Sequence, residues 1–185
     1  MNPTISNIKI TNLFLVSAII IGLYCTTLAN YLLFHSLVEI FSIVVAFSFF
    51  TIAWNSRNQI KNQYLLFIGI AYLFIAFLDL LHMLAYKGMS IFTDYDFYAN
   101  QLWIGARYME SITLIAAFYY LGREKTFKPG VLLISYTILT ALIVLSIFVW
   151  KIFPECFIAG TGLTSFNRIS IQSLVELATR SSSIN

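Results

Sequence analysis

Residues 64–86 read YLLFIGIAYLFIAFLDLLHMLAY, an apolar stretch that carries only one acid, Asp79, and one imidazole, His82. A transmembrane helix needs about 20 mostly apolar residues, so this stretch is long enough to cross a bilayer. Ionisable side chains inside a span are costly unless they face other polar groups within a helix bundle. The stretch therefore predicts a membrane helix whose polar side chains are directed toward neighbouring helices.

The composition of the whole chain agrees with a membrane location. Of its 185 residues, 59% are hydrophobic and 10% are charged, whereas soluble domains are about 25% charged. Four further stretches have the length and polarity of spans: about Thr11–Leu28, Phe34–Trp54, Leu102–Leu121 and Val131–Phe153. We therefore expect an all-α, polytopic transmembrane helix bundle of about five spans. The first stretch has an alternative interpretation as a cleaved signal peptide.

The loop cations predict the orientation of this bundle, because cytoplasmic loops carry an excess of Lys and Arg. With the N-terminus in the cytoplasm, six cations face inward: Lys9, Arg57, Lys61, Arg123, Lys125 and Lys128. Only Lys87 and Lys151 then lie near the outer ends of the spans. We expect a multi-pass protein of the cytoplasmic membrane. The scattered cations and the net charge of +3 give no indication of nucleic-acid binding.

Three domain segments follow from this pattern. Residues 1–10 are expected to form a short cytoplasmic stub, and residues 11–167 the membrane-embedded domain. Residues 168–185 are too polar to span and are expected to form a tail without an output domain.

Six polar residues form the candidate site, and each falls in the predicted outer half of its span. They are His35, Glu39, Asp79, His82, Arg107 and Glu110. Three of the five predicted helices contribute two of these residues each. The two residues of a pair are three or four positions apart, so they share one face of their helix. The three pairs therefore predict a polar pocket that opens outward, formed by three helices.

The occupant of this pocket has several candidates. The three carboxylates outnumber the one arginine, which favours a cation, a cationic ligand or bound protons. A divalent metal is a further candidate, with His35, Glu39, Asp79 and His82 as ligands, because imidazole and carboxylate bind such ions. The structural alternative is an internal salt-bridge network that holds three helices in register, with Arg107 as counter-ion. No other cofactor is expected.

Four segments resemble the membrane-associated sensor domain of the third MASE type. They are YLLFHSLVEIFSIVVAFSFFTIAWNSR, FIGIAYLFIAFLDLLHMLAYKGM, ANQLWIGARYMES and FPECFIAGTGLTSFN, in this order between residues 31 and 167. The resemblance implies a bacterial sensor module joined to a cytoplasmic output domain, which is a histidine kinase, a diguanylate cyclase or a related output domain. It also implies that the six residues of the predicted pocket belong to the motifs of the family.

The chain departs from the family pattern after Asn167, where related domains continue with further spans. We therefore expect a C-terminally truncated sensor domain, not itself an enzyme, with a small extracytoplasmic ligand or cation as stimulus and a homodimer as one candidate assembly. The alternative function is a small transporter or a proton pathway. The six polar residues all lie in the predicted outer half of the membrane, and the inner halves of the spans carry no charge. A polar pathway across the membrane is therefore disfavoured.

Overall fold

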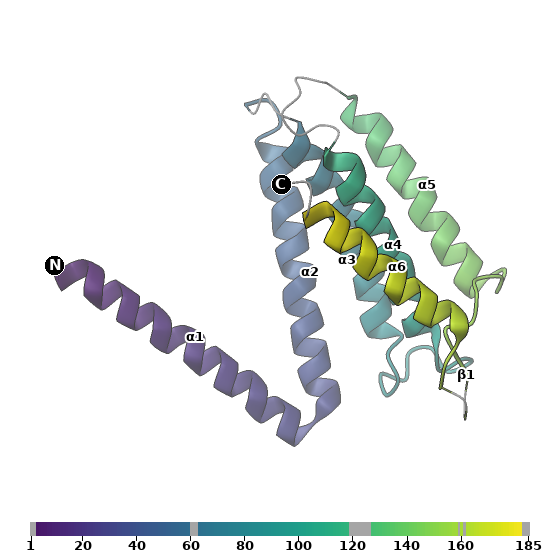
Figure 1. Cartoon of the computed structure of the whole chain (residues 1–185), viewed down its shortest axis with the longest axis horizontal. Coiled ribbons are helices and arrows are strands. Elements are labelled where there is room, and N and C mark those ends of the chain that lie inside the picture. The colour runs from purple at the N-terminus through teal and green to yellow at the C-terminus, as the bar shows by residue number, and fades with distance from the viewer. Residues whose placement is uncertain (1–2, 60–62, 119–126, 159, 161, 183–185) are drawn as a thin grey trace. The chain divides into compact units, whose positions relative to one another are not determined.

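The computed structural model describes residues 3–59, 63–118, 127–158, 160 and 162–182, and the regular secondary structure of these residues is helical except for one short hairpin (Figure 1). The elements are α1 (Pro3–Ala29), α2 (Tyr31–Asn55), α3 (Tyr64–Leu84), α4 (Tyr98–Phe118), α5 (Pro129–Phe148), β1 (Phe157–Ile158), β2 (Gly162–Leu163) and α6 (Ser165–Ser182). The strands pair antiparallel, with Phe157 opposite Leu163. The predicted all-α class is confirmed.

The chain divides into two compact units, Met1–Glu39 and Ile40–Asn185, and each is described by itself. The first unit contains α1 and the first turns of α2. Asn30 separates the two helices, and its Oδ1 accepts hydrogen bonds from the backbone N–H of Leu32 at 2.8 Å and of Leu33 at 3.3 Å. This side-chain cap satisfies amide groups that a new helix would otherwise leave without a partner.

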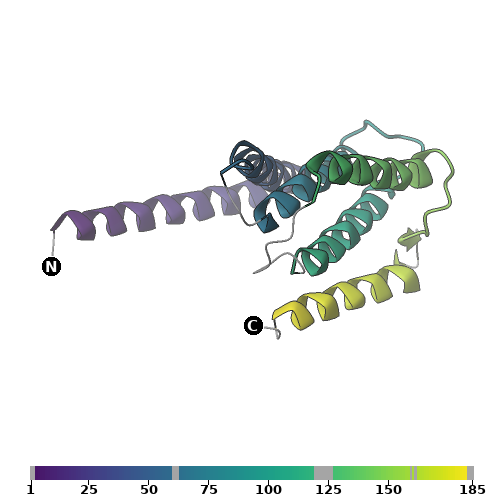
Figure 2. The same ribbon diagram turned by 90° about the horizontal axis from the view of Figure 1, so that it is seen from above.

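In the second unit, α4 is the central helix. It packs against α3, α5 and α6, and Figure 2 shows it between α5 and α6. The core lies along α3 and α4, where Ile70, Leu78, Leu102 and Ile104 are fully buried. The outer surface of α5 is apolar and exposed, as expected of a helix that faces lipid; its residues there include Val131, Ile134, Ile138 and Leu142.

Within the described part of the chain, four helices are long and apolar enough to cross a membrane: Asn12–Ala29 of α1, Tyr31–Asn55, Tyr64–Leu84 and Pro129–Phe148. The fifth predicted span, α4, forms a helix of similar length but is less apolar. It carries Arg107 and Glu110 and begins with a polar segment. Burial between three other helices is what allows this helix to lie at the centre of the unit.

The predicted boundaries differ from the observed ones in three places. Helix α1 begins at Pro3, so it covers most of the expected stub. Residues 168–182 of the expected tail belong to α6. Helix α5 ends at Phe148 although residues 149–153 are mostly apolar, because Lys151 has φ of 51° and the N–H groups of Ile152 and Phe153 bond back to the carbonyl of Ser146. The predicted end of the fourth span, Leu121, lies outside the described residues.

Gly69 of α3 lies at a close approach to α2. A Cβ built on Gly69 would lie 2.5 Å from Cβ of Ala53 and 3.5 Å from Cα of Phe50. Small residues permit such close approach of membrane helices. The contact therefore fixes the C-terminal half of α2 against the start of α3.

We expect Gly69→Val to lower the free energy of unfolding by about 1–3 kcal/mol, the usual cost of overpacking a tight contact. Thermal or denaturant unfolding of the purified chain in detergent measures this. Gly22→Val is the matched control, since Gly22 also lies within a helix and has nothing within 4 Å of an added Cβ. Equal effects of the two substitutions would show that helix propensity, not the contact with Ala53, is responsible.

Candidate functional site

An ion network connects the two central helices of the second unit. Nη2 of Arg107 on α4 donates to both carboxylate oxygens of Asp79 on α3, at 2.8 and 2.7 Å. Nη1 of the same guanidinium donates to Oε2 of Glu110 at 2.6 Å. The other oxygen of Glu110, Oε1, accepts a hydrogen bond from the hydroxyl of Tyr72 on α3 at 3.0 Å. One arginine therefore holds two carboxylates, and both helices contribute to each end of the network.

The network is largely removed from solvent. The side chain of Asp79 is 8% exposed, that of Glu110 is 22% exposed and that of Arg107 is 27% exposed. The three formal charges sum to −1. Because an uncompensated charge among apolar helices is costly, this surplus favours a bound cation or a bound proton at the network.

A cavity of about 320 Å³ lies beside the network, and we call it the inter-helix cavity. Its polar part consists of Tyr72, Asp79, Arg107 and Glu110. Its remaining lining is mostly apolar and comes from α2, α3 and α4: Ser42, Val45, Ala46, Phe49, Ile68, Ile75 and Leu114. A mostly apolar cavity with a few convergent polar groups is the usual form of a small-molecule site.

His82 lies one turn beyond Asp79 on α3 and is buried. Its Nδ1 lies 2.8 Å from the carbonyl oxygen of Ala99 on α4. Because a carbonyl oxygen only accepts hydrogen bonds, Nδ1 is the protonated nitrogen in this contact. In a neutral ring, Nε2 is then the nitrogen that can accept a hydrogen bond or bind a metal.

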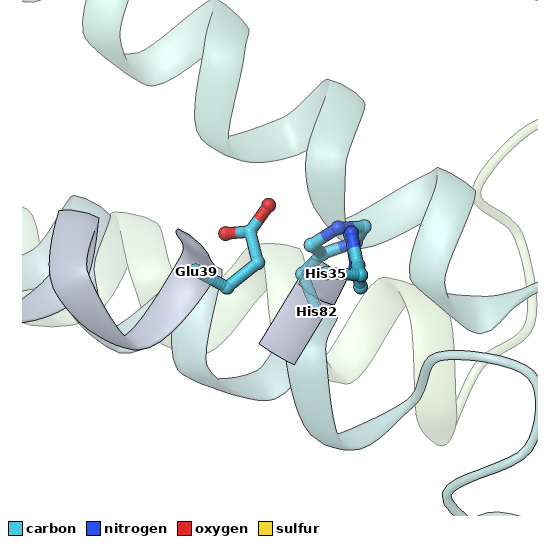
Figure 3. Close-up of side chains that lie close together, drawn as sticks. All are labelled: His35, Glu39 and His82. Carbon is cyan, nitrogen blue, oxygen red and sulfur yellow. The ribbon is translucent and has the colours of Figure 1, made fainter. Parts of the chain in front are cut away.

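His35 and Glu39 belong to the first unit, where they lie one turn apart on the same side of α2 (Figure 3). The ring of Tyr31 stacks on His35, with ring centroids 6.4 Å apart. Of the six predicted site residues, Asp79, Arg107 and Glu110 are joined by hydrogen bonds within the second unit. The metal set of His35, Glu39, Asp79 and His82 draws on both units and stays a prediction.

Tyr72 is the residue that the sequence prediction missed. It precedes Asp79 by seven residues, which is two helical turns, so the two side chains share a face of α3. This spacing could have identified it. The apolar residues of α2 that complete the cavity carry no comparable signal, because their types are common to every lipid-facing helix.

We expect Arg107→Met to destabilise the chain by about 3–5 kcal/mol, because it leaves two buried carboxylates without their common counter-ion. Replacing all three charges, as in Asp79→Leu/Arg107→Met/Glu110→Leu, is expected to cost less than this single change. Denaturant unfolding in detergent measures both.

Lys87→Met is the control for this comparison. Its ion pair with Asp96 is exposed and has an N–O distance of 3.4 Å, so its loss is expected to cost less than about 1 kcal/mol. A similarly small effect of Arg107→Met would contradict the importance of the buried network.

Comparison with known families places these features in one group of proteins. A family profile described as a membrane-associated sensor domain, MASE3, matches residues 26–178, which is most of the chain. The match covers α2 to α5 entirely and extends into α6. No curated protein and no solved structure matches. The chain therefore belongs to the MASE3 family of membrane-associated sensor domains, and such a domain is not itself catalytic.

Proposed function

We propose that this chain is the sensory input module of a bacterial signal-transduction protein of the histidine kinase or diguanylate cyclase type. Its stimulus is a small ligand, a cation or protons, and the site of action is the inter-helix cavity. The observation that carries this proposal is the Asp79–Arg107–Glu110 network at the wall of that cavity.

The chemistry of the network explains how occupancy would become a signal. Arg107 divides its donors between a carboxylate of α3 and a carboxylate of its own helix, α4. A cation or a proton that neutralises one carboxylate weakens that contact relative to the other. The balance between the contacts made within α4 and those made to α3 then changes. A ligand that binds two packings of the helices with different affinity shifts the population between them.

The predicted topology gives this site its direction. With the N-terminus in the cytoplasm, the network lies in the outer half of the membrane and receives an extracytoplasmic stimulus. His35 and Glu39 belong to the same proposal through their residue types, since imidazole and carboxylate groups bind cations. A cytoplasmic kinase or cyclase domain would respond to the movement of the helices.

A domain exchange tests the signalling role. Residues 26–178 replace the matching segment of a longer family member that carries a diguanylate cyclase domain, and cyclic di-GMP is measured in cells. Asp79→Asn and Arg107→Gln are expected to change the basal output or its response at least threefold. Asp96→Asn, an exposed carboxylate in the α3–α4 loop, is expected to leave the output unchanged. The proposal fails if apolar residues at all six predicted positions leave the output as it was.

The metal alternative has its own test, which does not need an output domain. The purified chain is analysed for bound metal and for thermal stability with added divalent ions. A stoichiometric metal that is lost in His35→Ala/His82→Ala would support a metal-binding pocket. The metal-binding pocket would be contradicted if neither the unmodified chain nor the variant contained metal and the variant were less stable at every metal concentration.

A further inference from the structure

A second polar cavity, of about 210 Å³, lies where α4 begins and α5 ends, and we call it the end cavity. It is lined by Asp94, Tyr95, Tyr98, Gln101, Ile147, Lys151, Phe153 and Glu155. None of these residues lines the inter-helix cavity. Since a water molecule takes about 30 Å³ of liquid volume, the end cavity has room for a small organic molecule. The predicted topology places it on the outer side of the membrane.

Side-chain contacts preform the walls of the end cavity. Tyr98, Gln101 and Ile147 are buried. Nε2 of Gln101 donates to the carbonyl oxygens of Phe153 and Pro154, at 3.0 and 3.2 Å, so the segment that follows α5 is attached to α4.

Lys151 follows the end of α5 and has a positive φ of 51°, a conformation that few residues other than glycine adopt. Its Nζ lies 3.4 Å from Oδ2 of Asp94. The turn thus directs this side chain toward the loop between α3 and α4.

The charges of the lining leave one carboxylate in excess. Oδ2 of Asp94 accepts a hydrogen bond from the hydroxyl of Tyr98 at 2.7 Å, in addition to its contact with Lys151. The bond from Tyr98, with Lys151 adding to it, lowers the pKa of the Asp94 carboxyl, so this group is ionised at neutral pH. Among the described lining residues, Lys151 supplies the one positive charge and Glu155 the second negative charge. The lining therefore sums to −1.

Aromatic rings form much of the remaining surface. Tyr95 and Tyr98 pack edge to face, with ring centroids 5.0 Å apart, and Phe153 adds a third ring. The hydroxyl of Tyr95 is buried without a hydrogen-bond partner among the described residues. Aromatic faces attract organic cations, and together with a carboxylate they are the usual means of binding an ammonium group.

We propose that the end cavity is a binding site for a small organic ammonium compound, with Glu155 facing the charge and the rings of Tyr95, Tyr98 and Phe153 surrounding its substituents. An anion would meet one lysine that already contacts Asp94. A metal ion would have to exchange its water for a lining that is partly aromatic ring surface, and Asp94 already contacts Tyr98 and Lys151. An ammonium group with apolar substituents matches both parts of the lining.

Choline is the probe for this proposal, and 3,3-dimethyl-1-butanol is its neutral control of nearly the same shape. Binding to the full chain in detergent is measured by isothermal titration at fixed ionic strength. We expect saturable binding of choline and at least tenfold weaker binding of the neutral alcohol. Glu155→Gln is expected to weaken choline binding about tenfold, whereas Asp96→Asn, which removes a carboxylate of the α3–α4 loop outside the cavity, changes it less than twofold.

Several results would overturn the proposal. They are no saturable binding of choline, equal binding of the neutral alcohol, or equal losses in Glu155→Gln and Asp96→Asn, which would indicate diffuse attraction by surface charge. If Glu155→Gln does not fold, the comparison of choline with the neutral alcohol on the unmodified chain decides by itself. Because the end cavity is separate from the inter-helix cavity, choline binding is also expected to persist in Asp79→Asn. Loss of choline binding in Asp79→Asn would indicate that the ammonium compound binds in the inter-helix cavity instead.

Discussion

Arg107 and its two carboxylate partners impose the main constraint on this fold. A guanidinium and two carboxylates can remain among apolar helices only where their hydrogen bonds are made inside the protein. Asp79 lies on α3, and both Arg107 and Glu110 lie on α4, so these two helices must pack side by side. The requirement also explains why α4, which is less apolar than α1, α2, α3 and α5, is central and contacts α3, α5 and α6.

Helix α2 contributes a different kind of contact to the second unit. It approaches α3 closely where Gly69 meets Ala53. Nearer the network, small and medium side chains of α2, such as Ser42 and Ala46, line the cavity. A helix that packs tightly at one level and borders a cavity at another can change its position at the cavity without losing the tight contact. This arrangement suits a sensor, because occupancy of the cavity then acts on one end of a helix held at the other.

The sequence predicts the main helices well, because a span is a local property. The length and polarity of residues 64–86 are sufficient to predict α3, and the spacing of Arg107 and Glu110 is sufficient to predict their common face. Helix ends are less predictable. The end of α5 depends on a positive φ at Lys151 and on bonds back to Ser146, and nothing in the apolar residues that follow Phe148 indicates this. The cavities are the least predictable, since their walls come from segments far apart in the chain and from residue types that lipid-facing helices share.

The inter-helix cavity and the end cavity each have a lining whose charges sum to −1, and both include residues of α4. Tyr98 and Gln101 line the end cavity, and Arg107 and Glu110 line the inter-helix cavity further along the same helix. Nine residues separate Tyr98 from Arg107, which corresponds to about 13 Å along a helix axis. A helix of this length moves nearly as a rigid body, so a displacement of α4 at one cavity changes the wall of the other. If both cavities bind ligands, each ligand must alter the affinity for the other by the same factor, since coupling between two binding sites is reciprocal. Helix α4 is therefore the element through which a signal from either cavity would reach the rest of the domain.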